Sequence, residues 1–176
     1  MNICVFCGSS AGTSTLYAET ARKLGFLMAG NGHQLIYGGG NIGLMGIVAD
    51  SVLAHGGEVT GIIPDFLMKK EVGHSGLTHL EVVKSMHERK RRMADLADAF
   101  VVLPGGWGTL DETAEILTWR QLELITQPIG LINVAGFFNL LLGQMQHMVK
   151  EGFLKPDYLS DVIVAETAEQ LLASLS

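Results

Sequence analysis

The chain has 176 residues, of which 48% are hydrophobic and 17% are charged, and its formal net charge is −6. This length suits one domain with an ordinary hydrophobic core, and this composition excludes a disordered chain. The negative charge argues against nucleic acid as a partner, because binding phosphates requires a basic face. No apolar run approaches the ~18 residues of a membrane span, and the N-terminal residues lack the basic start of a signal peptide. We therefore expect a single domain over residues 1–176 that is cytoplasmic and makes no membrane contact.

Short β-like runs alternate with helical stretches along the whole chain. The expected strands are 2–7, 33–37, 58–63, 79–83, 99–103, 129–133 and 162–164, and the expected helices are 13–30, 42–55, 85–97, 109–125, 137–151 and 167–175. Residues 64–80 are less regular and are expected to form a loop with a short helix. Nearly continuous apolar strands that alternate with helices are typical of a parallel sheet. The prediction is an α/β fold, a Rossmann-like doubly wound sheet of about seven parallel strands with helices on both faces.

The two cysteines, Cys4 and Cys7, have the C-x-x-C spacing of redox and zinc motifs. Redox pairs lie in a loop or at a helix start, whereas Val5 and Phe6 between these cysteines predict a buried strand. A single C-x-x-C also supplies zinc with only half of its ligands. We therefore expect no cysteine chemistry and, because the histidines do not cluster at ligand spacing, no metal.

The glycine-rich stretch GGGNIGLMG at 38–46 follows an expected strand and begins an expected helix. Its spacing is similar to the G-x-G-x-x-G of dinucleotide-binding turns, in which amides at a helix start bind phosphate. However, it follows the second strand rather than the first, and the next strand ends in Pro64 and Asp65, which departs from the dinucleotide-binding pattern. Tight turning and helix packing explain these glycines equally well, so a ligand role and a structural role both remain open.

The stretch LPGGWGTLDE, which follows the fifth expected strand, is more specific. Pro104 ends the strand, and Gly105, Gly106 and Gly108 allow a tight turn with a close approach of the backbone. Thr109 is a natural helix N-cap whose hydroxyl can also bind a phosphate oxygen. We therefore expect this loop to bind an anion.

Carboxylates follow this anion loop at once. Asp111 is explained by the positive end of the helix macrodipole, whereas Glu112 and Glu115 have the i, i+3 spacing that points two side chains along one face, near the anion. Such a site repels itself unless a cation intervenes. Arg89 and Lys90 are the candidates, because their helix leads into the strand before the loop; a solvated basic face is the alternative.

These segments resemble a known family. SMHERK followed by PGGWGTLDE, with CVFCGSS and YGGGNIGLMG upstream, is similar to the LONELY GUY (LOG) family of cytokinin riboside 5′-monophosphate phosphoribohydrolases, whose members are often labelled lysine decarboxylases. The likeness extends over essentially the whole chain. It implies a nucleotide-binding catalytic domain that hydrolyses the N-glycosidic bond of an adenosine 5′-monophosphate, plain or N6-modified, to free base and ribose 5-phosphate. It further implies a homodimer and no cofactor.

The resemblance assigns roles to individual residues. The family's catalytic arginine and glutamate fall on Arg89 and Glu112. Its other nucleotide contacts fall on Glu71, Lys90, Gly106, Trp107, Gly108, Thr109, Leu110, Asp111 and Thr118. Two further candidates for nucleotide contact come from the sequence pattern rather than from the resemblance. Gly105 is one because its backbone belongs to the loop, and Glu115 is the other because its side chain is expected to face the anion.

Two departures from the plant members lie beside the loop, and they concern base preference and affinity. Trp107 stands where those members usually have tyrosine, and Asp111 where they often have glutamate. Met86 and Met93 are the apolar candidates to line a pocket for a prenyl group. The sequence does not choose between adenine and its prenylated forms.

The implied chemistry agrees with the residues. Breaking an N-glycosidic bond builds positive charge on the ribose, and a carboxylate close to C1′, expected to be Glu112, stabilises that charge or orients the attacking water. Arg89 either orients Glu112 or polarises the leaving base. A pyridoxal phosphate decarboxylase would need a lysine in an S-x-H-K setting, which this sequence does not have. The alternative outside enzymology is a nucleotide or molybdenum-cofactor carrier, which need not keep Arg89 and Glu112.

Overall fold

The structure is a computed structural model that describes residues 1–68 and 73–175. Its centre is a seven-stranded sheet with the order β4-β3-β2-β1-β5-β6-β7, in which each neighbouring pair is parallel. The strands are β1 (Asn2–Phe6), β2 (Gln34–Tyr37), β3 (Val59–Pro64), β4 (His79–Val83), β5 (Ala99–Val102), β6 (Ile129–Ile132) and β7 (Val162–Ala165). The predicted α/β class and the parallel sheet are confirmed.

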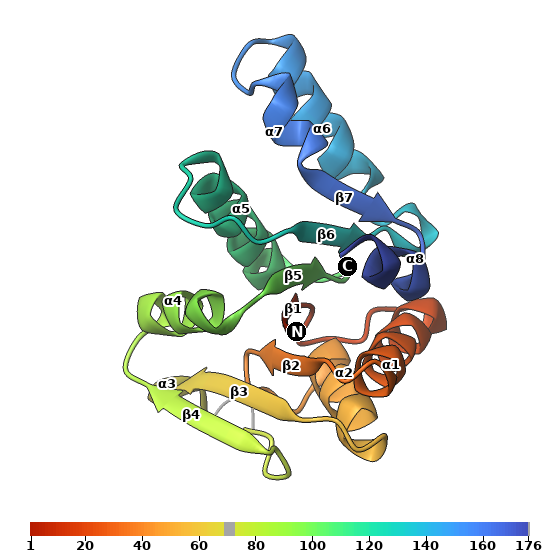
Figure 1. Cartoon of the computed structure of the whole chain (residues 1–176), viewed down its shortest axis with the longest axis vertical. Helices are drawn as coiled ribbons and strands as arrows, with labels where there is room; N and C mark the ends of the chain where they lie inside the picture. Colours follow the sequence, from red (N-terminus) through yellow and green to blue (C-terminus); the bar gives the residue numbers. More distant parts are fainter. Residues whose placement is uncertain (69–72, 176) are drawn as a thin grey trace.

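Helices cover both faces of this sheet (Figure 1). They are α1 (Thr15–Gly30), α2 (Gly43–Ala54), α3 (Asp65–Met68), α4 (Met86–Leu96), α5 (Trp107–Gln121), the 3-10 turn η1 (Val134–Gly136), α6 (Asn139–Lys150), α7 (Pro156–Ser160) and α8 (Ala168–Ser174). Residues of α1, α2 and α8 form one hydrophobic cluster, and residues of α4, α5 and α6 form the other. The doubly wound architecture is therefore as predicted. Among the described helices, none combines the length and the apolar character needed to cross a bilayer.

Strand β1 contributes to both clusters, because successive side chains of a strand point to opposite faces. Val5 and Cys7 belong to the cluster under α1, α2 and α8, whereas Cys4 and Phe6 belong to the cluster under α4 and α5. Both thiols are free and buried, and burial raises the pKa of each well above its usual value. The C-x-x-C spacing therefore places one small apolar side chain in each half of the core.

The chain changes winding direction between β1 and β5. From β1 it proceeds through β2 and β3 to the edge strand β4; α4 then crosses back to β5, and β6 and β7 continue to the other edge. Strands β1 and β5 pair in register from Ile3 with Ala99 to Phe6 with Val102. Open α/β sheets bind ligands outside the carboxyl ends of the strands at such a switch point. The loops CGSS and LPGG both lie there.

The largest departures from the predicted helices concern α5 and α7. Helix α5 begins at Trp107 rather than residue 109, and it ends at Gln121 rather than residue 125, because Glu123 has a φ of 57° and interrupts the helical path. Helix α7 was not predicted, since it has five residues and too few apolar positions to show a period. The short helix expected within 64–80 is confirmed as α3, and Glu71 lies outside the described residues.

Candidate active site

The two loops at the switch point touch through their backbones. The amide of Gly8 donates to the carbonyl oxygen of Pro104 at 3.0 Å. A Cβ atom on Gly105 would lie 2.9 Å from the nitrogen of Gly8 and 2.0 Å from Oγ1 of Thr109. A residue with a side chain would therefore push the loop after β5 away from β1. Glycine at position 105 allows α5 to begin directly at the crevice.

Helix α5 presents its first amides toward this crevice. Gly106 is the N-cap residue, no described side chain caps the helix, and the first helical bond runs from the amide of Leu110 to the carbonyl of Gly106 at 3.0 Å. The amides of Trp107, Gly108 and Thr109 precede that bond, so they belong to the end of the helix that attracts anions. We define residues 105–109 as the anion loop; it contains the first amides of α5, and its binding of an anion stays a prediction.

One detail of that prediction is wrong. Thr109 is not the N-cap but the third residue of α5, and its side chain is buried against Gly105. The glycines before the predicted cap let the chain enter the helix earlier than Thr109 would. The hydroxyl of Thr109 still lies within the anion loop.

The carboxylates of α5 do not serve the macrodipole. No acidic residue lies in the first turn of α5, so the explanation expected for Asp111 is wrong. Instead, Nζ of Lys90 lies 3.1 Å from Oδ2 of Asp111 and 3.1 Å from Oε2 of Glu115. Burial acts to lower the pKa of Lys90, but the bonds to Glu115 and Asp111 outweigh it and raise that pKa. The expected cation between the acids is therefore Lys90.

Arg89 points in a different direction, into the molecule, and only 5% of the residue is exposed. Its Nε donates to the carbonyl of Ile62 at 3.1 Å, its Nη2 donates to the carbonyl of Gly38 at 3.0 Å, and its Nη1 lies 3.8 Å from the sulfur of Met86. These partners fix the guanidinium at the carboxyl ends of β2 and β3. All three partners are neutral, so none of them offsets its positive charge.

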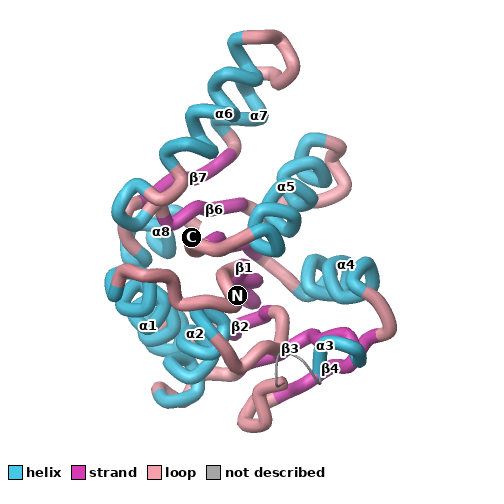
Figure 2. Tube along the Cα trace, turned by 180° about the vertical axis from the view of Figure 1, so that it is seen from behind, coloured by secondary structure: helices cyan, strands magenta, loops and turns pink. Residues whose placement is uncertain are grey.

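The charges of Glu112 and Arg89 both affect the pKa of one buried thiol, that of Cys4. Burial is the main cause that raises the pKa of Cys4, and the negative charge of Glu112 is the second. The positive charge of Arg89 lowers that pKa. Glu112 also raises the pKa of Cys7. The charges of both predicted catalytic residues therefore reach the same buried thiol of β1; Arg89 belongs to α4 and Glu112 to α5, and both helices pack on the same face of the sheet (Figure 2).

The first glycine-rich stretch has structural roles that explain its composition. A Cβ atom on Gly38 would lie 1.7 Å from Nη2 of Arg89, so this position must be glycine for Arg89 to reach the carbonyl. Gly43 has a φ of 61°, and its Cβ atom would lie 2.3 Å from the carbonyl carbon of Ser9. The first amide after it, that of Leu44, donates to the carbonyl of Gly8 at 3.0 Å. The amide therefore already has a protein acceptor, which favours the structural interpretation.

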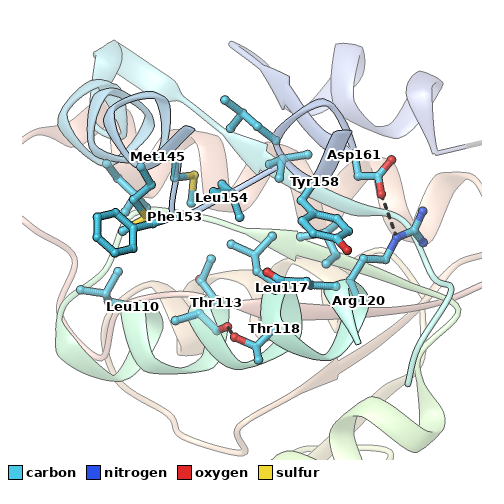
Figure 3. Close-up of a pocket in the computed structure, with 17 residues that line it drawn as sticks. Leu110, Thr113, Leu117, Thr118, Arg120, Met145, Phe153, Leu154, Tyr158 and Asp161 are labelled. Carbon is cyan, nitrogen blue, oxygen red and sulfur yellow. Dashed lines mark hydrogen bonds and ion pairs between the residues drawn. The ribbon is translucent and has the colours of Figure 1, made fainter. Parts of the chain in front are cut away.

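An apolar groove of about 550 Å³ runs along the other side of α5, between it and α6 and α7 (Figure 3). Leu110 and Leu117 line it from α5, and Met145 and Phe153 line it from α6 and the turn that follows. Thr118 also lies on this groove, nine residues beyond Thr109 and hence about 14 Å along the helix. The structure thus separates Thr118 from the anion loop within one chain.

The remaining predicted residues are placed as follows. Trp107, at the start of α5, is strongly exposed, whereas Met93 belongs to the hydrophobic core and does not line a base pocket. Met86 contacts Arg89. In the part of the chain that the structure describes, no three His, Cys, Asp or Glu side chains gather as metal ligands do. The role of Gly38 had no separate signal in the sequence, because it is one of three consecutive glycines.

Comparisons with known proteins agree with this geometry. A family described as "Possible lysine decarboxylase" matches residues 45–175. The probable cytokinin riboside 5′-monophosphate phosphoribohydrolase LOGL1 of Oryza sativa is 43% identical over 173 residues, which are 98% of this chain and 78% of that protein. The phosphoribohydrolase LOG1 of Arabidopsis thaliana is also 43% identical, over 98% of this chain and 81% of that protein.

Solved structures show the same fold at lower identity. The molybdenum cofactor carrier protein of Chlamydomonas reinhardtii superposes with a TM-score of 0.73 at 20% identity, over 98% of this chain and 93% of that chain. At such identity the likeness concerns the fold alone. The sequence relatives are closer and cover nearly the whole chain, and the chain therefore belongs to the LOG family, which is also described as the possible lysine decarboxylase family.

Proposed function

We propose that this protein hydrolyses the N-glycosidic bond of an adenosine 5′-monophosphate, plain or N6-modified, and releases the base and ribose 5-phosphate. The observation on which this depends is the position of Glu112 on α5, one turn beyond the anion loop, on the same face of the sheet as the helix that carries Arg89. The relatives named as cytokinin riboside 5′-monophosphate phosphoribohydrolases support this reaction. The bases that it would release are a cytokinin or adenine.

The 5′-phosphate is expected to bind the anion loop. The loop amides and the N-terminus of α5 offer hydrogen bonds and a positive dipole without a side-chain cap. Gly105 brings these amides close to β1, and Gly106, Gly108 and Thr109 continue the loop. Phosphate binding at this point positions the ribose, so binding energy away from the reacting bond lowers the barrier to cleavage.

Glu112 is proposed to act at C1′. It lies three residues beyond Thr109, which corresponds to about 4.5 Å along the helix axis. A carboxylate here stabilises the positive charge that develops on the ribose, or directs a water molecule to C1′. Arg89 is proposed to stabilise the negative charge that develops on the departing base. Its fixed guanidinium would also favour the ionised form of Glu112.

The two other hypotheses receive less support. The relatives are named as phosphoribohydrolases, so the family description of a possible lysine decarboxylase does not identify a pyridoxal phosphate enzyme. A carrier function rests on structures that are 20% and 22% identical, whereas the hydrolase relatives are 43% identical. Arg89 and Glu112, which a carrier need not keep, are both present in this chain.

A second copy of this chain is proposed to complete the site. The faces of α6 and of the turn after it carry large apolar side chains that are almost fully exposed, 89% for Leu140 and 88% for Phe153. Thr118, if it contacts the nucleotide as the resemblance implies, must contact one bound at the anion loop of a partner chain. A second copy that covers the apolar groove would bury Phe153 and approach Thr118. Leu140 lines a separate hollow beside the anion loop, which the same copy is proposed to cover as well.

The test is release of free base from AMP and from isopentenyladenosine monophosphate, with Glu112→Gln as the comparison. We expect the wild-type protein to release base from one or both, and E112Q to bind AMP with unchanged affinity but to lose turnover. Turnover of E112Q near the wild-type rate would contradict the assignment. AMP binding without release by the wild type would favour the carrier. The nucleotide contacts of Glu71 and Leu110, the single-domain organisation and the cytoplasmic location stay predictions.

A further inference from the structure

Lys90 ties together α4 and α5, the two helices that carry the proposed catalytic residues Arg89 and Glu112. Its ammonium bonds one carboxylate on each of two successive turns of α5, Asp111 and Glu115, at 3.1 Å each. We propose that Lys90 is a positioning residue, whose ammonium clamps α4 to α5 and so sets the spacing between Arg89 and Glu112. This inference rests on the proposed hydrolase function and deepens it.

The order of residues on the two helices makes the clamp local to the site. On α4, Lys90 directly follows Arg89, whose guanidinium is held by the carbonyls of β2 and β3. On α5, Glu112 directly follows Asp111 and lies within the turn that the clamp spans. A shift of α5 relative to α4 therefore changes the distance between Arg89 and Glu112. The clamp opposes that shift from both sides of Glu112.

Low solvent exposure strengthens the ion pair between Lys90 and Glu115. The side chain of Lys90 is 11% exposed and that of Glu115 is 25% exposed, so their pair is shielded from solvent more than a surface pair. Asp111 is more exposed, at 62%. Removing one partner of a shielded pair leaves a charge without compensation, which disturbs the contact more than loss of a surface pair does. Glu115 should therefore matter more than Asp111.

The rival role for Lys90 is direct contact with the nucleotide, as the resemblance implies. An ammonium has three donors, and two of them are already directed at carboxylates. The two carboxylates also cancel its charge, which weakens its attraction for a phosphate. The two roles differ in a measurable way, because a positioning residue acts only through its partners, whereas a substrate ligand acts without them.

A mutant cycle in the full-length protein separates the two roles. The variants are Lys90→Met, Asp111→Asn with Glu115→Gln, and all three together, with exposed Lys84→Met as the matched control. We expect K90M to lower kcat for base release about 10- to 100-fold, as a displacement near 1 Å does, with KM changed little. The D111N/E115Q variant should lose a similar factor. K90M should then have no further effect in that double-variant background, and K84M should behave as wild type.

Each alternative outcome overturns the proposal. If K90M raises KM tenfold at unchanged kcat, or still lowers activity in the D111N/E115Q background by the same factor, Lys90 contacts the nucleotide. If K90M does not fold, as judged by circular dichroism, the D111N/E115Q variant alone must show the kcat loss without a KM change. If the wild-type protein releases no base, the proposed function is wrong and the positioning role is wrong with it.

Discussion

Replacing Gly38 with alanine should displace Arg89, the proposed catalytic arginine, without changing the fold. The new Cβ atom would lie 1.7 Å from Nη2 and 2.9 Å from Cζ of Arg89. Because these atoms belong to the end of a flexible side chain, the overlap is relieved by moving Arg89 rather than the backbone. The arginine then loses its bond to the carbonyl of Gly38. G38A therefore tests the position of Arg89 while leaving its chemical identity intact.

The magnitude follows from the contact that is lost. A hydrogen bond of a charged group contributes about 1.5–3 kcal/mol, so the free energy of unfolding should fall by about that amount. For a chain of this size the melting temperature then falls by roughly 3–12 °C. Because misplacing a catalytic group by about 1 Å costs roughly 100-fold in rate, we expect kcat for base release to fall by about that factor.

Gly30→Ala is the matched control for this prediction. Gly30 ends α1, and a Cβ atom there would have no neighbour within 4 Å. G30A should keep wild-type activity and melt at the same or a slightly higher temperature, because alanine restricts the unfolded chain. The measurements are thermal unfolding by circular dichroism and base release under saturating nucleotide. If G38A matches G30A in both, the contact of Gly38 with Arg89 does not position the site.

Three further predictions test other parts of the structure. Gly105→Ala should raise the dissociation constant for AMP at least about tenfold, measured by titration calorimetry, because its Cβ atom would force the anion loop away from β1. Cys4 and Cys7 should not react with a thiol reagent such as DTNB at pH 8 in the native protein and should both react after unfolding, since burial raises the pKa of each thiol. Leu140→Asp and Phe153→Asp should each shift the protein from dimer to monomer, as measured by light scattering. Each substitution places a charge on the apolar face that the second copy is proposed to cover. A wild-type protein that is already monomeric would contradict the proposed dimer.

The fold was predictable because its signals are local. Most strands of the sheet are short apolar runs, and the helices between them have apolar periods. The rule that ligands bind at the carboxyl ends of parallel strands then placed the anion loop and Glu112 at one edge of the sheet. Pro104 and the glycines after it mark that edge without any knowledge of tertiary contacts.

The contacts between elements were not predictable in the same way. Periodicity shows which face of a helix is apolar, but it does not show which residue lies across from Lys90. The sequence suggested that Asp111 serves the helix dipole, whereas the structure pairs it with Lys90. Helix α5 has its N-cap at Gly106, three residues before Thr109, so Asp111 lies beyond the first turn, where the dipole acts.

The crossover helix α4 links the fold to the proposed chemistry. It is the connection through which the chain passes from the β1–β4 half of the sheet to the β5–β7 half. Arg89 anchors α4 to the first half through carbonyls at the ends of β2 and β3, and Lys90 anchors it to α5, which follows β5. Neither half alone brings a fixed guanidinium to Glu112. The adjacent pair Arg89 and Lys90 therefore does two jobs that depend on each other, since the arginine supplies the charge and the lysine holds the carboxylate's helix where that charge can act.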